Sequence, residues 1–163
     1  MIMRNGQPQR GFTFIELAIT VAIVALLATL VLPMAELTVK RDREHELRLA
    51  LREIRTALDA YKQAVDEGRI SSEPDKSGYP PQLKLLVDGV TDERSPDRNS
   101  KIYFLRRIPR DPMNTDASKT NDETWGKRSY ESSPDAPEAG DDVFDVYSQA
   151  TDVGLNGVPY RDW

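Results

Sequence analysis

The sequence predicts an α+β fold, in which one long amino-terminal helix packs on a small antiparallel sheet with long loops. Three observations predict it. Residues 12–32 form an apolar run of 21 residues that contains a single ionisable side chain, Glu16. Residues 47–65 carry apolar side chains at alternating spacings of four and three, which is typical of an amphipathic helix. The remainder alternates short apolar runs with Pro, Gly, Asp and Ser, which predicts short strands between turns.

Composition limits the classes of function. The 163 residues suffice for one modest domain. The formal net charge is −5, so nucleic acid is not expected as a partner, because phosphate binding depends on clustered Lys and Arg. The chain has no cysteine, which excludes disulfides, thiolate metal sites and cysteine nucleophiles. Membrane lipid and other proteins are the expected partners.

The apolar run is long enough to cross a membrane. As a helix, its residues would extend roughly 30 Å, the thickness of the hydrocarbon core. A cleavable secretory signal has a shorter apolar run followed by a small-x-small site, so this alternative is disfavoured. A plain uncleaved signal anchor stays open. Basic residues lie on both sides of the run, at positions 4 and 10 and at positions 40, 41 and 43, so charge alone does not fix its orientation.

A short motif lies where the apolar run begins. Residues 9–17 read QRGFTFIEL: a basic leader ends at Gly11, Phe12 follows, and Glu16 lies four residues beyond Phe12. This motif resembles the type III signal of type IV pilins and pseudopilins. The resemblance implies that residues 1–11 are a leader peptide. It also implies that a prepilin peptidase of the membrane cuts between Gly11 and Phe12 and N-methylates Phe12.

Glu16 is an acid inside an apolar segment. A carboxylate in lipid costs on the order of a few kcal/mol and persists there mainly when it has a partner. The resemblance implies that this partner is the free amine of Phe12 in a neighbouring subunit, which sets the register of a growing filament. The alternative is that Glu16 extends to the lipid headgroups, because it lies within about one and a half turns of the end of the segment.

Pro33 follows the apolar run and has two interpretations. A proline removes a backbone hydrogen bond, so it either ends the helix or kinks it. We favour a kink, so that the spanning part, residues 12–33, continues as an amphipathic helix over residues 34–67 that ends near Gly68. The apolar stripe of that helix is expected to dock on the domain rather than form a coiled coil. It consists of Leu47, Leu51, Ile54, Leu58, Tyr61 and Val65. His45 lies among charged residues, so a catalytic role is not expected.

Residues 68–163 are expected to hold the loops and the sheet. A short helix is predicted over residues 82–87, ending at Gly89, and strands are predicted over residues 125–130 and 143–148. Residues 114–123 and 132–141 have loop composition. Asp141, Asp142 and Asp145 could suggest paired catalytic carboxylates, but no phosphate loop, nucleophile elbow or pair of metal-ligating histidines accompanies them. We therefore predict that the chain is not an enzyme.

The order of short motifs in this half narrows the resemblance. The motifs GYP at 78–80, IPRDP at 108–112, WG at 125–126 and DVYS at 145–148 occur in an order similar to that of major pseudopilins of type II secretion systems. The resemblance implies a single-pass protein of the bacterial inner membrane, with its amino terminus in the cytoplasm and its carboxy-terminal domain in the periplasm.

The same resemblance implies a structural function. Copies of the chain would assemble with minor pseudopilins, on an inner-membrane platform, into a helical pseudopilus that helps to move proteins through the outer membrane. A type IV pilus pilin is the alternative, although many pilins close a loop with a disulfide that this chain cannot form. An anchored binding module that acts alone would leave Glu16 unexplained.

A calcium ion is the one cofactor that the resemblance implies. Major pseudopilins hold it in the loop after the last strand, which corresponds here to residues 148–163. Calcium takes about six to eight oxygen ligands, which Ser148, Asp152, Asn156 and Asp162 could supply in part, together with backbone carbonyls. The alternative is that these are solvated turn residues.

Overall fold

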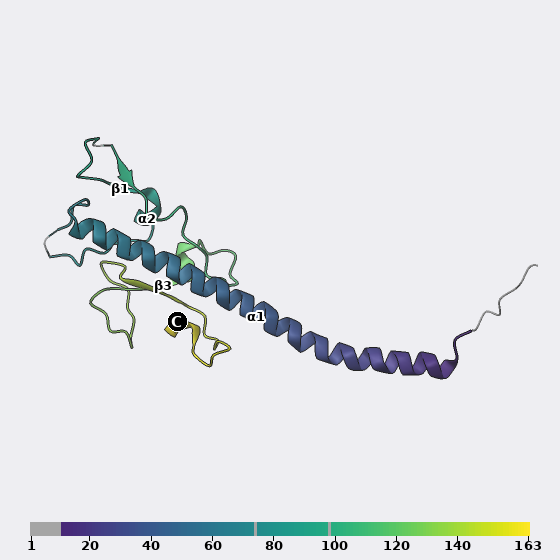
Figure 1. Cartoon of the computed structure of the whole chain (residues 1–163). Coiled ribbons are helices and arrows are strands. Elements are labelled where there is room, and N and C mark those ends of the chain that lie inside the picture. The colour runs from purple at the N-terminus through teal and green to yellow at the C-terminus, as the bar shows by residue number, and fades with distance from the viewer. Residues whose placement is uncertain (1–10, 74, 98) are drawn as a thin grey trace, which may run out of the picture. The chain divides into compact units, whose positions relative to one another are not determined.

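The computed structural model describes residues 11–73, 75–97 and 99–163, and for residues 30–33 it describes the backbone alone. Most of the predicted leader, residues 1–10, therefore lies outside the described residues. The elements are α1 (Phe14–Asp66), α2 (Leu85–Asp88), β1 (Val90–Thr91), β2 (Lys101–Ile102), the 3₁₀ turn η1 (Asp122–Thr124), β3 (Trp125–Arg128), β4 (Asp145–Ser148) and the 3₁₀ turn η2 (Tyr160–Asp162) (Figure 1). One long helix with small antiparallel sheets confirms the α+β prediction.

The chain divides into two compact units, one that ends at Lys40 and one that comprises Arg41–Trp163. In the first unit, the described side chains from residue 11 to residue 39 are exposed, although most of them are apolar. Among the described residues, α1 is the one helix that is long and apolar enough to cross a membrane. The helix runs through residue 33 without a break, so the interpretation of Pro33 as a terminator is wrong. The side chain of Pro33 lies outside the described part.

Helix α1 ends as the sequence predicts, at a glycine. Gly68 has a φ of 68°, which costs a glycine little. Its amide donates to the carbonyl of Val65 at 2.8 Å, and the amide of Arg69 donates to the carbonyl of Ala64 at 2.8 Å. These two bonds form a Schellman motif, which satisfies carbonyls that the last turn would otherwise leave unpaired.

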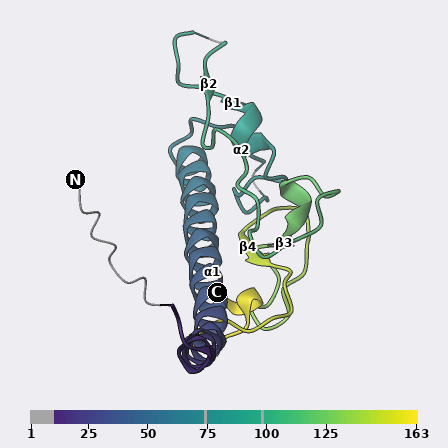
Figure 2. The ribbon, with the colours of Figure 1, turned by 90° about the vertical axis from the view of Figure 1, so that its right-hand side faces the viewer.

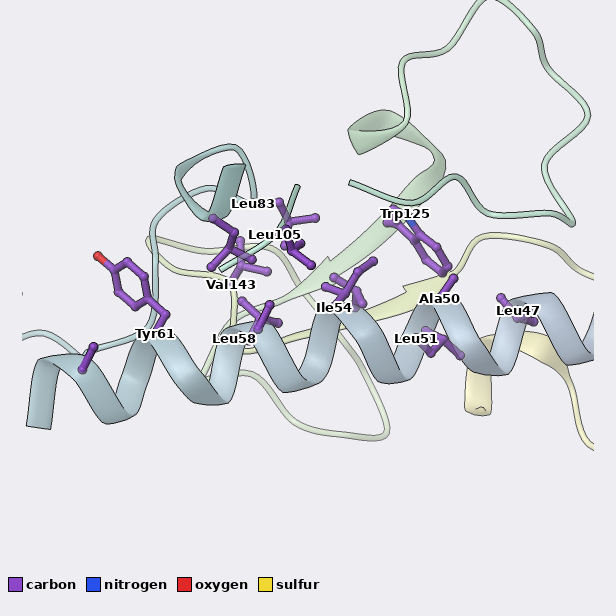
Figure 3. Close-up of a cluster of buried hydrophobic side chains, with 14 of the residues drawn as sticks. Leu47, Ala50, Leu51, Ile54, Leu58, Tyr61, Leu83, Leu105, Trp125 and Val143 are labelled. Atoms are coloured by element: carbon purple, nitrogen blue, oxygen red, sulfur yellow. The ribbon is translucent and has the colours of Figure 1, made fainter. Parts of the chain in front are cut away.

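The second unit has its own hydrophobic core, built on one face of α1 (Figure 3). Leu47, Leu51, Ile54, Leu58 and Tyr61 of the predicted stripe are buried, and Val65 packs at its edge, so the docking prediction is confirmed. Alanines at positions 50, 57 and 64 widen the buried face. Side chains from the rest of the chain cover it, chiefly Leu83, Leu86, Leu105, Trp125, Val143 and Val146.

The sheet is split into two small antiparallel pairs. β1 pairs with β2 near the carboxy-terminal end of α1, and β3 pairs with β4 beside the middle of the helix part in this unit (Figure 2). The pair β3 and β4 was predicted, but both strands are shorter than expected. Residues predicted at the ends of these strands form other backbone hydrogen bonds. The amide of Ser129 donates to the carbonyl of Glu138 at 2.9 Å, and the amide of Val143 donates to the carbonyl of Pro80 at 2.8 Å.

Three further details differ from the sequence prediction. The β1 and β2 pair was not predicted, because two residues per strand are too few to show an alternating pattern. The short helix predicted over residues 82–87 is present as α2, but it begins later, at Leu85. Gly89 follows the end of this helix, as predicted, and has a φ of 77°. The predicted loop over residues 114–123 leads into the 3₁₀ turn η1.

Candidate processing and assembly site

The junction at Gly11 and Phe12 is open. The side chain of Phe12 is 84% exposed, and a Cβ added at Gly11 would have no heavy atom within 4 Å. No described contact therefore requires a glycine at position 11. An exposed junction with a small residue before the bond is accessible to a peptidase.

Glu16 lies in the first turn of α1, just after this junction. Its amide donates to the Thr13 hydroxyl at 3.3 Å, and the amide of Leu17 donates to the Thr13 carbonyl at 3.1 Å, so Thr13 caps the helix. Thr13 and Glu16 have the spacing of a capping box, and an acid here also suits the positive end of the helix dipole. This capping role was not predicted from the sequence.

The Glu16 carboxylate has no hydrogen bond or ion pair with any other side chain or backbone group that the structure describes. Its surroundings on α1 are apolar and exposed: Phe14 is 87% and Ile15 67% exposed. The nearby hydroxyl of Thr20 already has a partner within the helix, because it donates to the carbonyl of Leu17 at 2.8 Å. A carboxylate that enters lipid or an apolar assembly is stabilised by a cationic or hydrogen-bond-donating partner.

The motifs that carry the resemblance in the second unit meet in space. The indole nitrogen of Trp125 donates to the carbonyl of Pro109 at 2.8 Å. The Ser148 hydroxyl donates to the carboxylate of Asp111 at 2.6 Å, and both side chains are fully buried. The ring of Tyr79 contacts that of Phe144 edge to face, with centroids 5.0 Å apart. These contacts join loop residues of the motifs to β3, to β4 and to Phe144, the residue just before β4.

The four predicted calcium ligands lie in different surroundings. Ser148 is buried and bonded to Asp111. Asn156 and Asp162 share a hollow whose lining includes Arg48, Arg52 and Arg55, whereas Asp152 does not line that hollow. Three arginines line it against two acids, Asp59 and Asp162, which makes it a poor site for a divalent cation.

The described residues contain no cluster of three or more His, Cys, Asp or Glu side chains that could hold a metal ion. The donor set as arranged does not fit a calcium ion bound by all four residues. Calcium binding by this segment stays a prediction.

Comparison with known proteins agrees with these features. The family described as the prokaryotic N-terminal methylation motif matches residues 7–32, which include Gly11, Phe12 and Glu16. The chain is 33% identical over 125 residues to the type II secretion system core protein G of Pectobacterium carotovorum subsp. carotovorum, covering 76% of this chain and 74% of that protein. The chain belongs to the core protein G family.

Other members of the family cover more of the chain. Core protein G of Klebsiella pneumoniae is 28% identical over 142 residues, which cover 84% of this chain and 94% of that protein. That of Dickeya chrysanthemi is 27% identical over 156 residues, covering 91% and 95%. No solved structure matches the chain. The likeness to core protein G therefore includes both the apolar helix and the domain that packs on it.

Proposed function

We propose that this chain is a structural subunit of a type II secretion pseudopilus. The observation that carries the proposal is Glu16, an acid without a partner among the described residues, at the exposed apolar start of α1 and directly after the Gly11 junction. Membership of the core protein G family and the match to the methylation motif support it. A structural subunit of this kind carries out no catalysis.

The subunit would be inserted in the bacterial inner membrane by residues 12–33, with residues 34–163 in the periplasm. A prepilin peptidase would hydrolyse the bond between Gly11 and Phe12 and methylate the new amine of Phe12. That amine carries a positive charge at neutral pH, because the α-amino pKa lies near 8. This amine would pair with Glu16 of an adjacent copy in a helical filament. The filament would assemble on an inner-membrane platform and would include minor pseudopilins. Filament growth would then assist protein export.

The decisive experiment separates the charge of Glu16 from its place in the helix cap. Glu16→Gln keeps a capping-box residue but removes the charge. Thr13→Ala removes the cap and keeps the charge. In a strain that lacks the chromosomal copy, we expect Glu16→Gln to be cleaved normally, to form few filaments and to secrete poorly. Thr13→Ala is expected to retain most assembly.

Glu36→Ala is the matched control, because Glu36 is another exposed acid on α1. It should assemble and secrete as the wild type does. Normal filament yield from Glu16→Gln would contradict the pairing role and favour a carboxylate that extends to the headgroups. Wild-type secretion in the deletion strain, together with loss of surface fibres, would instead indicate a type IV pilus pilin.

A further inference from the structure

The segment after β4, residues 149–163, has little hydrophobic anchoring of its own. Within it, Gly154 and Tyr160 are buried, while Val153, Leu155 and Val158 remain 38–46% exposed. A short hairpin gives it local order, because the Gly154 amide donates to the Val158 carbonyl at 2.9 Å. A hairpin this small is marginal alone, so contacts from elsewhere must hold it in place.

Glu44 of α1 provides the first such contact. It is 4% exposed, although it carries a carboxylate. Its Oε1 accepts the amide of Leu155 at 2.7 Å and the hydroxyl of Tyr160 at 3.0 Å. Burial and the bond to Glu44 raise the pKa of Tyr160 to about 12, so that hydroxyl remains a donor at neutral pH. Hydrogen bonds to a charged acceptor are among the stronger ones in proteins.

Two arginines of α1 provide the rest. The Arg48 guanidinium lies over the ring of Trp163, 4.3 Å from its centroid, and reaches Oε2 of Glu44 at 4.0 Å. Arg55 donates to the carbonyl of Trp163 at 2.7 Å and to that of Val146 at 3.2 Å. Arg55 also forms an ion pair with Asp145 of β4 at 2.8 Å. The guanidinium of Arg55 thus links β4 to Trp163.

The spacing of these residues explains how one helix makes all the contacts. Positions 44, 48 and 55 are separated by four and seven residues, which places them on one face of α1. On the other side, Tyr160 packs edge to face on Trp163 at 5.1 Å, and the Trp163 indole donates to the carbonyl of Val158 at 3.2 Å. Glu44 thus contacts Tyr160, Tyr160 contacts Trp163, Trp163 contacts Arg48, and Arg48 contacts Glu44.

We propose that Glu44, Arg48 and Arg55, together the C-terminal clamp, hold residues 149–163 on α1 without a metal ion. The clamp occupies the part of the fold where the family resemblance implies calcium. Arg48 and Arg55 also line the hollow that contains Asn156 and Asp162, so the clamp itself supplies positive charge where a cation would have supplied it. Residues 149–163 should therefore be ordered in the absence of calcium.

Hydrogen exchange measured by mass spectrometry on the full chain in detergent tests the proposal. The readout is the exchange rate of amides in residues 149–163, in millimolar calcium and in chelator. In the wild type we expect the same slow exchange in both. Glu44→Ala should speed exchange about tenfold or more in both conditions, because it removes two hydrogen bonds while alanine preserves the helix. Asp152→Ala should change nothing.

Two further variants provide a milder second test and a control. Tyr160→Phe removes one bond to Glu44 and retains the ring on Trp163, so a smaller increase in exchange is expected even if Glu44→Ala folds poorly. Glu46→Ala, at an exposed acid two residues away, should exchange as the wild type does. Slower exchange of the wild type in calcium than in chelator would overturn the proposal. Unchanged exchange in Tyr160→Phe would overturn it equally.

Discussion

Gly11 has a predicted role in processing and no described role in the fold. Nothing in the described chain fills the space beside its Cα, so a larger side chain would meet no steric obstacle there. We expect Gly11→Val to fold and insert normally but to accumulate as the longer precursor, because the peptidase would no longer accept the residue before the cut. Immunoblotting of membranes measures this, and Gly11→Ala, which stays small, is the control. Normal trimming of the valine variant would refute the type III signal.

Asp111 makes stability depend on pH in an unusual direction. Burial raises the pKa of Asp111 above its ordinary value, although the hydrogen bond from Ser148 opposes this shift. The folded protein therefore binds this proton more tightly than the unfolded chain does. Its stabilising contribution is full below the ordinary aspartate pKa and is lost as the pH rises through the raised value.

Asp111→Asn replaces the carboxyl group by an amide that is neutral at every pH. This variant should therefore not lose stability as the pH rises. Between acidic and neutral pH, the melting temperature of this variant should rise relative to the wild type. Asp92→Asn is a control of opposite sign, because the bond from Arg69 lowers the pKa of Asp92. That carboxylate stabilises the fold above its ordinary pKa, so its variant should lose stability at neutral pH. Parallel melting curves for wild type and Asp111→Asn would contradict the argument.

Glu44 is the residue that sequence reasoning missed, although the sequence contains a signal for it. It lies three positions before Leu47 and seven before Leu51, so it continues the apolar stripe with an acid. A charge on the buried face of a helix requires a partner. Its partners, Leu155 and Tyr160, lie more than a hundred residues away along the chain, and no local pattern could identify them.

Among the elements, the pairing of β3 with β4 explains the glycine at position 126. Gly126 pairs with Tyr147, and a Cβ at Gly126 would lie 2.3 Å from the tyrosine ring. We expect Gly126→Ala to lower the free energy of unfolding by about 1–3 kcal/mol, as overpacking does in other interiors. Thermal melting measures this. In a Tyr147→Ala background the same change should cost much less, and equal costs in the two backgrounds would exclude the ring as the cause.

The elements that the sequence predicted best are those with long patterns. The stripe from Leu47 to Val65 spans several helical turns, and Gly68 marks its end, so the helix and its buried face follow from periodicity alone. β1 and β2 have two residues each and depend on tertiary contacts, such as the amides of Phe104 and Leu105 donating to the carbonyl of Leu86. Contacts of that kind have no local signature.

At the scale of the whole molecule, the described hydrophobic core belongs to one of the two units. Every residue of the buried hydrophobic cluster lies in the unit Arg41–Trp163, from Leu47 to Tyr160. A fragment that begins at Arg41 contains this core and all three residues of the C-terminal clamp. It should therefore fold as a soluble, cooperative monomer that forms no filaments, since it lacks Phe12 and Glu16.

A second fragment that begins at Leu47 keeps the same core but loses Glu44. The amide of Leu155 and the hydroxyl of Tyr160 would then lose a charged acceptor, at a cost of about 1.5–3 kcal/mol. For a domain of this size, the melting temperature should fall by roughly 5–10 °C relative to the Arg41 fragment. Adding calcium should not restore it, because the clamp needs a carboxylate at position 44 rather than a cation. Equal melting temperatures for the two fragments would show that Glu44 does not hold residues 149–163, and full rescue by calcium would show that a metal can hold them.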